Sequence, residues 1–323
     1  MKKIRWGMVG CGAVTEVKSG PGLQRAEGSC VMAVMRRDGS LAEDYARRHG
    51  IGKWYDDAEK LIGEPDVDAV YVATPPSSHK EYAIAAANAG KDVYVEKPMA
   101  MTFDECQEMI AACKENGVRL FVAYYRRALP RFVKIKSLID DGAIGKVSFA
   151  DVVYHKRASE SDLAGTENWR VDPRVAGGGY FYDLAPHSID ILQFLLGDAK
   201  SAKGYVSNQR RRYEAEDIVS GAMLLGDDVH VTMLWNFNAY GNMDRTEIVG
   251  DEGKLTFSTF GDGPIVLETQ DSTEEFNIEN PLHIQQPLIQ TIVNELRGDG
   301  HCPSTGDTAA KTNWVMDRIF ESD

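Results

Sequence analysis

Lys3-Ile4-Arg5-Trp6-Gly7-Met8-Val9-Gly10-Cys11-Gly12-Ala13-Val14 is the stretch that decides the fold of this chain. An apolar strand candidate runs directly into Gly-Cys-Gly and then into a helix candidate. Glycines let a backbone approach dinucleotide phosphates closely, and the start of a helix supplies free N–H groups. The usual third glycine would fall at Thr15, so the fingerprint is incomplete. A glycine-rich turn that binds nothing explains the same residues, and the rest of the chain must decide.

Length and composition indicate a globular chain with room for two domains. It has 323 residues, of which 43% are hydrophobic and 26% charged. A net charge of −13 opposes general binding of nucleic acid, which needs basic surfaces. No apolar run approaches the roughly 20 residues of a membrane span. The apolar stretch after Met-Lys-Lys is short and contains Arg5, so it is read as a first strand, and we expect a cytoplasmic protein.

The five cysteines are scattered and form no C-x-x-C pair. Such spacing supports neither a disulfide framework nor a zinc site. We therefore expect reduced thiols and no metal.

The first 123 residues alternate between strand and helix signals, which predicts a doubly wound parallel sheet. Gly20-Pro21-Gly22 is expected to interrupt the first helix. The expected strands are Ile4–Val9, Cys30–Met35, Ala69–Ala73, Asp92–Val95 and Leu120–Ala123. The expected helices are Leu41–His49, Ser78–Ala89 and Phe103–Asn116.

From residue 124 onward the pattern changes to helix candidates and a series of strand candidates separated by turn signals. We therefore expect a domain boundary after residue 123. Apolar residues alternate with others along 229–238, so one face of this strand is buried. The other face is mixed rather than charged, which makes it a candidate contact with a second subunit. Expected helices are 130–140, 284–297 and 308–320, and a loop followed by a helix is expected over 177–196. Expected strands are 146–157, 202–210, 218–225, 229–238, 245–249, 254–258 and 265–269.

The residues that end the second strand bear on the choice of cofactor. Asp or Glu at this position usually accepts the ribose 2′-hydroxyl of NAD, whereas Arg accommodates the 2′-phosphate of NADP. Arg36 and Arg37 form a local anion site in an acidic chain. We expect NADP(H) in preference to NAD(H), although Asp38 leaves NAD open, and a solvated loop explains the pair as well.

Two further strand ends carry candidate cofactor contacts. Thr74-Pro75-Pro76 is a stiff loop followed by His79, and Glu96-Lys97-Pro98 places a lysine before a proline. Taken alone, Lys97 is better explained as a solvated surface lysine. Ligands in such sheets bind at the carboxyl ends of the strands, so these segments share one edge with the glycine turn.

These segments and Gly177-Gly178-Gly179-Tyr180-Phe181-Tyr182-Asp183-Leu184-Ala185-Pro186-His187 occur in one order along the chain. In that order they resemble the glucose–fructose oxidoreductase / inositol dehydrogenase / MocA family over essentially the whole sequence. Arg37-Asp38 and Trp169-Arg170 look most like its NADP-linked members, which include 1,5-anhydrofructose reductase and dimeric dihydrodiol dehydrogenase. The resemblance implies a dinucleotide-binding Rossmann domain at 1–123. It also implies a substrate-binding and oligomerisation domain at 124–323, of the α+β class, with a large, mostly antiparallel sheet.

The resemblance also implies catalytic roles for Lys97, Asp183 and His187. Asp183 and His187 are four residues apart, so on a helix they share a face. A histidine suits general acid–base work on a carbonyl or hydroxyl, and Lys97 would stabilise a developing alkoxide. The triple glycine would let this helix start approach the cofactor. An exposed i,i+4 pair is the alternative, but the apolar neighbours disfavour it.

The implied activity is hydride transfer between nicotinamide and a carbonyl or secondary alcohol of a sugar, polyol or cyclic diol. Alternatives are redox-neutral, NAD-dependent glycoside cleavage within the same family, and a non-catalytic cofactor-binding regulator. We expect a homodimer or homotetramer formed through the C-terminal sheet. The expected cofactor contacts are Gly10, Cys11, Gly12, Ala13, Val14, Arg36, Arg37, Thr74, Pro75, Pro76, His79, Glu96, Lys97, Pro98, Trp169 and Arg170. Weaker substrate candidates are Tyr124, Arg126, Tyr154 and His283.

Overall fold

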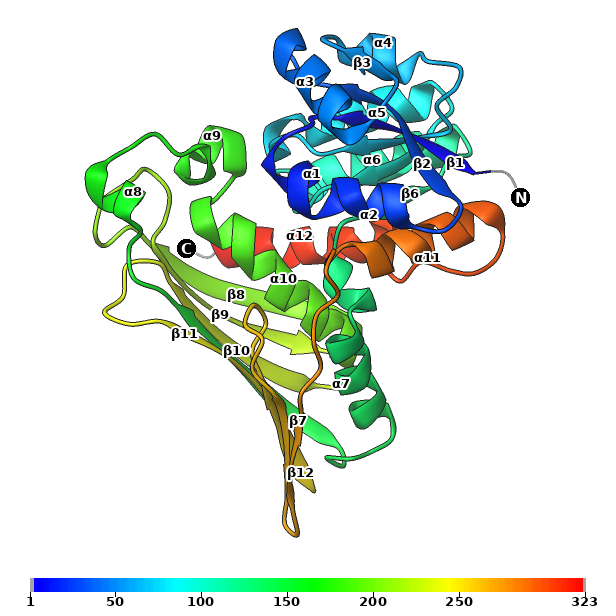
Figure 1. Cartoon of the computed structure of the whole chain (residues 1–323). Coiled ribbons are helices and arrows are strands. Elements are labelled where there is room, and N and C mark those ends of the chain that lie inside the picture. The colour runs from blue at the N-terminus through cyan, green and yellow to red at the C-terminus, as the bar shows by residue number, and fades with distance from the viewer. Residues whose placement is uncertain (1–2, 322–323) are drawn as a thin grey trace. The chain divides into compact units, whose positions relative to one another are not determined.

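The computed structural model describes residues 3–321 and divides them into two compact units (Figure 1). Unit 1 contains the residues through Leu129 together with Pro281–Ala310, and unit 2 contains Pro130–Asn280 and the residues from Lys311 onward. The division differs from the single boundary expected after residue 123, because Pro281–Ala310 belongs to unit 1. A bridge pairs Phe121 with Thr305, and the hydroxyl of Ser304 donates to the carbonyl of Val122 at 2.7 Å.

Unit 1 is built on a six-stranded parallel sheet with the order β3-β2-β1-β4-β5-β6. The order reverses between β1 and β4, which is where doubly wound sheets place their ligand crevice. The predicted parallel sheet is confirmed. Its strands are β1 (Ile4–Val9), β2 (Ser29–Met35), β3 (Lys53–Tyr55), β4 (Ala69–Val72), β5 (Asp92–Val95) and β6 (Leu120–Val122).

The helices of unit 1 follow the sequence signals except at the first one. Gly20-Pro21-Gly22 lies inside α2, and the break falls at Lys18 instead. Pro21 lies in the first turn of α2, where its missing N–H costs no helical hydrogen bond. The α-helices are α1 (Ala13–Val17), α2 (Ser19–Arg25), α3 (Gly39–His49), α4 (Ala58–Ile62), α5 (His79–Asn88), α6 (Phe103–Glu115) and α11 (Gln286–Arg297). Short 3₁₀ turns are η1 (Pro76–Ser78) and η2 (Tyr125–Ala128).

Unit 2 is built on an eight-stranded sheet with the order β14-β13-β12-β11-β7-β10-β9-β8. Only the pair β7–β10 is parallel, so the predicted, mostly antiparallel sheet is confirmed. Its strands are β7 (Val147–His155), β8 (Ala199–Ser207), β9 (Ile218–Leu225), β10 (Val229–Asn236), β11 (Met243–Gly250), β12 (Gly253–Phe257), β13 (Ile265–Thr269) and β14 (Thr273–Phe276). Its helices are α7 (Pro130–Asp140), α8 (Glu160–Ala164), η3 (Trp169–Val171), α9 (Pro173–Ala176) and α10 (Gly179–Leu196), while α12 (Gly306–Phe320) spans the division between the units.

Strand β10 shows how one face of this sheet becomes a core. Val229, Val231, Met233 and Trp235 are buried, whereas the residues between them reach solvent. The long helix α10 packs on the buried face against β9 and β10 (Figure 1). Because α10 is anchored along most of its length, the residues of its first turns have fixed positions.

None of the helices within residues 3–321 has the length and apolar character needed to cross a membrane. In the same residues no group of three or more His, Cys, Asp or Glu side chains is arranged to hold a metal ion. The five cysteines, all within these residues, form no disulfide.

Candidate functional site

The glycine turn after β1 is held open by its backbone. Gly10 has a φ of +94°, and a Cβ added there would lie 2.8 Å from Cγ2 of Thr74. A Cβ on Gly12, by contrast, would meet only one atom, 3.9 Å away. Gly10 therefore permits the turn, while Gly12 leaves its outer side free for a ligand to approach.

Thr15, which stands in place of the third glycine, is fully buried and locks the turn. Its hydroxyl donates to the carbonyl of Gly12 at 2.8 Å, and its own carbonyl accepts the hydroxyl of Tyr45 at 2.8 Å. The incomplete fingerprint thus belongs to a turn whose geometry is fixed by side-chain hydrogen bonds rather than by a third glycine.

The carboxyl end of β2 presents two exposed arginines next to this turn. The guanidinium of Arg36 donates to the carbonyl of Cys11 at 3.4 Å. Asp38 is the N-cap of α3, and its Oδ1 accepts the backbone N–H groups of Ser40 and Leu41 and the hydroxyl of Ser40. These hydrogen bonds lower the pKa of Asp38. Oδ1 of Asp38 is therefore engaged in the helix cap, and the guanidinium of Arg37 next to it is exposed.

His79 has a structural role in the loop after β4. Its ring is fully buried, with Nδ1 2.9 Å from the carbonyl of Pro98 and Nε2 2.7 Å from that of Thr74. Burial lowers the pKa of His79, which outweighs the opposing effect of the two carbonyls. Both ring nitrogens are used, so the expected cofactor contact is replaced by a link between the loop after β4 and the loop after β5. The proline loop itself is closed by the hydroxyl of Ser78 donating to that of Thr74 at 2.8 Å.

Glu96 is likewise buried, beneath the lysine that follows it. Its Oε1 accepts the hydroxyl of Tyr71 at 2.6 Å and the amide of Gln285 at 2.8 Å. Its Oε2 accepts the backbone N–H of Lys97 at 3.2 Å. Glu96, expected at the cofactor, instead anchors the backbone that presents Lys97. Sequence reading missed Tyr71, whose place on the strand next to β5 is the only signal for this contact.

Two of the weaker substrate candidates in unit 1 are buried. Tyr124 is fully buried in the hydrophobic core of the unit, so it is a packing residue rather than a substrate contact. Arg126 is 5% exposed and its guanidinium lies 5.0 Å from the ring centroid of Tyr125. His283, half-buried at the start of the returning segment, has both ring nitrogens shielded from solvent and without a hydrogen-bond partner.

In unit 2, α10 carries Tyr180, Asp183 and His187 at spacings of three and four residues, which places them on one side of the helix. Asp183 is partly exposed, and its Oδ2 lies 3.5 Å from Nε of Arg170. His187 is 5% exposed and its ring lies 6.0 Å, centroid to centroid, from that of Phe260. The predicted sharing of a face is present, together with a cation beside the carboxylate.

The three glycines at the start of α10 serve packing inside unit 2. A Cβ on Gly179, whose φ is +62°, would lie 2.5 Å from Cβ of Ala215. Side chains on Gly177 and Gly178 would collide with the ring of Tyr182. The expected reason for these glycines, close approach to a cofactor, is therefore replaced by the room that Tyr182 and Ala215 require.

A chain of hydrogen bonds ties the loop before η3 to the start of α10. The hydroxyl of Tyr180 donates to Asp162 at 2.8 Å and accepts the amide of Asn168 at 3.0 Å. Oδ1 of Asn168 in turn accepts the backbone N–H of Arg170 at 3.1 Å. Arg170 also contacts Asp183. The network therefore fixes the position of the guanidinium that faces the Asp183 carboxylate. The guanidinium of Arg170 lies 4.4 Å from the ring centroid of Trp169, which is 40% exposed.

Aromatic rings line the same region of the sheet. The ring of Tyr154 lies 5.0 Å from that of Phe260 and 6.2 Å from that of Phe237. Burial raises the pKa of Tyr154, and the carboxylates of Asp244 and Asp183 add to this effect. Sequence reading missed Lys156, which continues the alternation of Val152 and Tyr154 onto the same face of β7.

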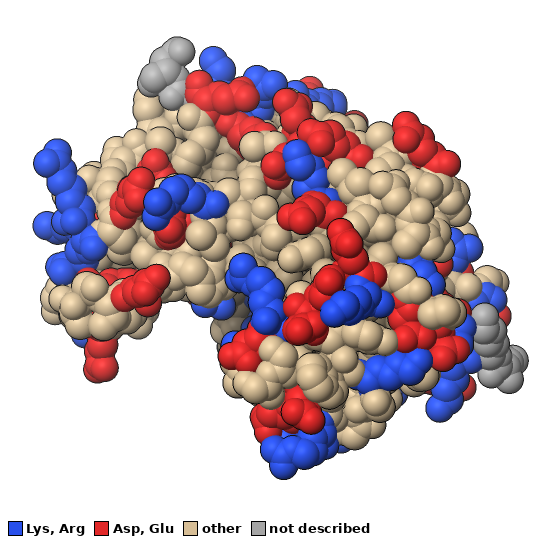
Figure 2. Space-filling model, turned by 90° about the horizontal axis from the view of Figure 1, so that it is seen from above, with Lys and Arg blue, Asp and Glu red and all other residues tan. Residues whose placement is uncertain are grey.

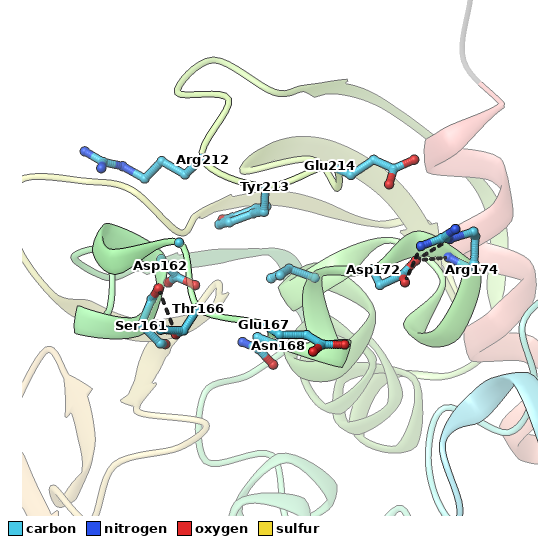
Figure 3. Close-up of a pocket in the computed structure, with 12 residues that line it drawn as sticks. Ser161, Asp162, Thr166, Glu167, Asn168, Asp172, Arg174, Arg212, Tyr213 and Glu214 are labelled. Carbon is cyan, nitrogen blue, oxygen red and sulfur yellow. Dashed lines mark hydrogen bonds and ion pairs between the residues drawn. The ribbon is translucent and has the colours of Figure 1, made fainter.

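A pocket of about 240 Å³ lies in unit 2 between the segments 161–174 and 212–214 (Figure 3). Figure 3 shows Asp162 and Tyr213 across it from each other, while Arg174 is paired with Asp172. Its rim carries both acidic and basic side chains, and neither Asp183 nor His187 lines it. The pocket therefore adjoins the Asp162–Tyr180 network but is separate from the residues with candidate catalytic roles.

The surface charge is mixed on the face drawn in Figure 2, where acidic and basic side chains alternate over short distances. On this face, therefore, the acidic side chains that give the chain its net charge of −13 do not form one continuous negative patch.

Comparisons with known proteins agree on one family. Residues 4–124 match the family described as "Oxidoreductase family, NAD-binding Rossmann fold", and residues 132–256 match the "GFO/IDH/MocA C-terminal domain". The chain is 40% identical over 316 residues to Oxidoreductase P35 of Formosa agariphila, covering 98% of each protein. It is 29% identical to 1,5-anhydro-D-fructose reductase of Ensifer adhaerens, over 94% of this chain and 91% of the relative.

A solved structure of levoglucosan dehydrogenase with NADH and levoglucosan has the same fold, with a TM-score of 0.87 at 23% identity. The match covers 99% of this chain and 97% of that one. Two family domains in sequence, a relative matched end to end, and the observed pair of sheets lead to one conclusion. The chain belongs to the GFO/IDH/MocA family of oxidoreductases and carries its NAD-binding Rossmann fold.

Proposed function

We propose that this protein transfers a hydride between a nicotinamide cofactor and a carbonyl or secondary alcohol of a sugar, polyol or cyclic diol. The observation that carries the proposal is the pair Asp183 and His187 on one side of α10, with Arg170 held against Asp183. Relatives named for 1,5-anhydro-D-fructose and levoglucosan support the substrate class.

The strand ends of unit 1 fit a dinucleotide. The backbone at Gly10 and the open side of Gly12 form a cradle that a larger residue would fill. We propose that Gly10–Val14 bind the pyrophosphate, Thr74–Pro76 border the nicotinamide half, and Lys97 and Pro98 border the reacting centre. Trp169 and Arg170 of unit 2 are further candidate contacts. When bound, the nicotinamide ring supplies or accepts the hydride.

Side chains of this protein would transfer the proton to or from the substrate oxygen and would stabilise the charge that develops on it. In the direction of reduction, His187 would give a proton to the oxygen that becomes a hydroxyl; in oxidation it would take that proton. Lys97 would stabilise the negative charge that develops on this oxygen. Asp183, with Arg170 beside it, would accept a substrate hydroxyl and fix the ring in place.

We further propose that the cofactor is NADP(H) rather than NAD(H). The cap of α3 occupies Oδ1 of Asp38 and fixes the direction of its carboxylate, which leaves only Oδ2 for a ribose 2′-hydroxyl. Arg37 is exposed and offers a charge for a 2′-phosphate. A fluorescence titration should give tighter binding of NADPH than of NADH, and Arg37→Ala should weaken NADPH binding about tenfold or more while leaving NADH unchanged. Equal affinities in the wild-type protein would refute the cofactor proposal.

The catalytic proposal is tested with His187→Ala and the matched variant His301→Ala, which changes an exposed histidine. Turnover of aldoses, ketoses, inositols and cyclic diols is followed at 340 nm. Loss of a general acid should lower kcat about 10²-fold or more in His187→Ala, with cofactor affinity unchanged. His301→Ala should behave as wild type. Unchanged turnover in His187→Ala would remove it from catalysis, and a tightly bound cofactor with no net change at 340 nm would favour glycoside cleavage.

We also propose that the protein is cytoplasmic and forms a homodimer or homotetramer through the open face of the unit 2 sheet. That face exposes Phe149, Leu234 and Met243. Light scattering after size exclusion tests the assembly, since Leu234→Lys should shift it toward the monomer.

A further inference from the structure

Lys156 is the cation that the proposed reaction does not use. It follows β7 directly, and its backbone continues the sheet by donating to the carbonyl of Asn236 at 2.9 Å and accepting from Ala239 at 3.0 Å. The alternation of the strand puts its side chain on the face that α10 covers. The sheet therefore fixes the backbone of Lys156.

The ammonium group lies against aromatic rings. Its Nζ is 3.8 Å from the ring centroid of Tyr180 and 5.9 Å from that of Phe237. Tyr180 is one helical turn before Asp183 on the same side of α10. These rings hold the ammonium group in a partly buried position. It lies next to the residues of α10 that are proposed to bind the substrate.

The two carboxylates whose charges act on Lys156 have other partners. Asp162 accepts the hydroxyl of Tyr180 and the backbone N–H of Ser159, while Asp183 faces Arg170. No side-chain carboxylate among residues 3–321 lies within ion-pair distance of Nζ of Lys156. Burial lowers the pKa of Lys156, and the fields of Asp162 and Asp183 oppose that change. The ammonium donors are thus left for an acceptor that is not part of the protein.

We propose that Lys156 is a specificity-determining residue that binds an acidic group of the substrate, a carboxylate or a sulfate, next to the hydroxyl held by Asp183. The preferred substrates are therefore acidic sugars rather than neutral ones. Since Arg170 compensates Asp183, an anion at Lys156 does not face an unopposed carboxylate. The inference rests on the proposed oxidoreductase function and names the class of sugar on which it acts.

The test uses sugars in matched sets: a neutral hexose, its uronic acid and its 6-sulfate. Turnover is followed at 340 nm, and binding to the enzyme saturated with cofactor is measured by calorimetry. The variants are Lys156→Gln, Lys156→Arg and, as a matched control, Lys200→Gln at an exposed lysine of β8.

The wild-type protein should bind at least one acidic member about tenfold or more tightly than its neutral counterpart. Lys156→Gln should abolish this preference through KM, leaving kcat and the neutral sugar within twofold, whereas Lys156→Arg and Lys200→Gln should retain it. The comparison of uronic acid with sulfate identifies the group. Turnover of the neutral sugar shows that the variant is folded.

Two results would overturn the proposal: equal binding of neutral and acidic sugars by the wild-type protein, or a loss in Lys156→Gln that is the same for both. Failure of the proposed function is a separate outcome, recognised as binding of the sugars without turnover of any of them. In that case the calorimetric comparison of wild type with Lys156→Gln still decides whether Lys156 selects an acidic ligand.

Discussion

Replacing Glu96 by glutamine preserves the size of the side chain but removes one acceptor and the charge. Oε1 of Glu96 accepts Tyr71 and Gln285, and Oε2 accepts the N–H of Lys97. Glutamine has a single acceptor oxygen, and its NH₂ group can only donate. In the better of its two orientations the amide oxygen keeps Tyr71 and Gln285, and its NH₂ then faces the N–H of Lys97.

The cost follows from these contacts. One donor left without an acceptor costs about 1–3 kcal/mol, and hydrogen bonds to a neutral oxygen are weaker than those to a carboxylate. We expect Glu96→Gln to lower the free energy of unfolding of unit 1 by about 2–4 kcal/mol. Because the lost acceptor holds the backbone of Lys97, kcat should fall as well, with little change in cofactor affinity.

Urea unfolding followed by circular dichroism measures the effect. Glu115→Gln is the matched control, since Glu115 is exposed at the end of α6 and should change stability by about 0.5 kcal/mol or less. A loss below about 0.5 kcal/mol in Glu96→Gln would show that the buried carboxylate does not hold this loop, and the positioning argument for Lys97 would then be wrong.

Three further predictions concern residues that hold the loops and helix ends around the candidate site. Gly179→Ala should cost about 2–4 kcal/mol in urea unfolding, because its φ is +62° and its Cβ would strike Ala215; Gly165→Ala, with a φ of +64° but open surroundings, should cost only about 1 kcal/mol. If the two variants lose the same amount, packing at Ala215 is not the reason for the glycine. Tyr180→Phe should open the loop before η3 to limited proteolysis, whereas Tyr205→Phe, at a position 77% exposed, should not. His79 has a lowered pKa in the folded protein, so its contribution to stability should be full above the unfolded pKa of about 6.5 and should decline as pH falls below that value. His79→Asn should make this decline of stability with pH less steep. An unchanged slope would show that other groups cause the decline.

Sequence patterns predicted the two sheets because both depend on local rules. Valine-rich strands between capped helices require a sheet covered on both faces, and the alternation along β10 requires one buried face. The start of α6 follows such a rule, since Thr102 is its N-cap and the hydroxyl of Thr102 accepts the N–H of Glu105 at 3.2 Å.

The individual side chains of the site were harder to predict, since a strand end shows which residues are near an edge but not which way they point. His79 and Glu96 stand in motifs typical of cofactor contacts, yet both are buried and bonded inside unit 1. Their partners come from the loops after β4 and β5, from β4 or, as with Gln285, from a segment 189 positions away. Lys156 was missed because one lysine after an apolar strand gives no local sign of the rings around it.

The return of residues 281–310 to unit 1 has a consequence for how the protein is made. During synthesis the Rossmann sheet emerges first, but Gln285, Ser304 and Thr305 arrive only after the whole of the second sheet. Until then the Glu96 carboxylate lacks one of its donors, and the edge at β6 has no cover from this segment. We therefore expect a nascent chain stalled at residue 280 to hold unit 1 in a looser, protease-sensitive state, which tightens only after residues 281–310 have been made.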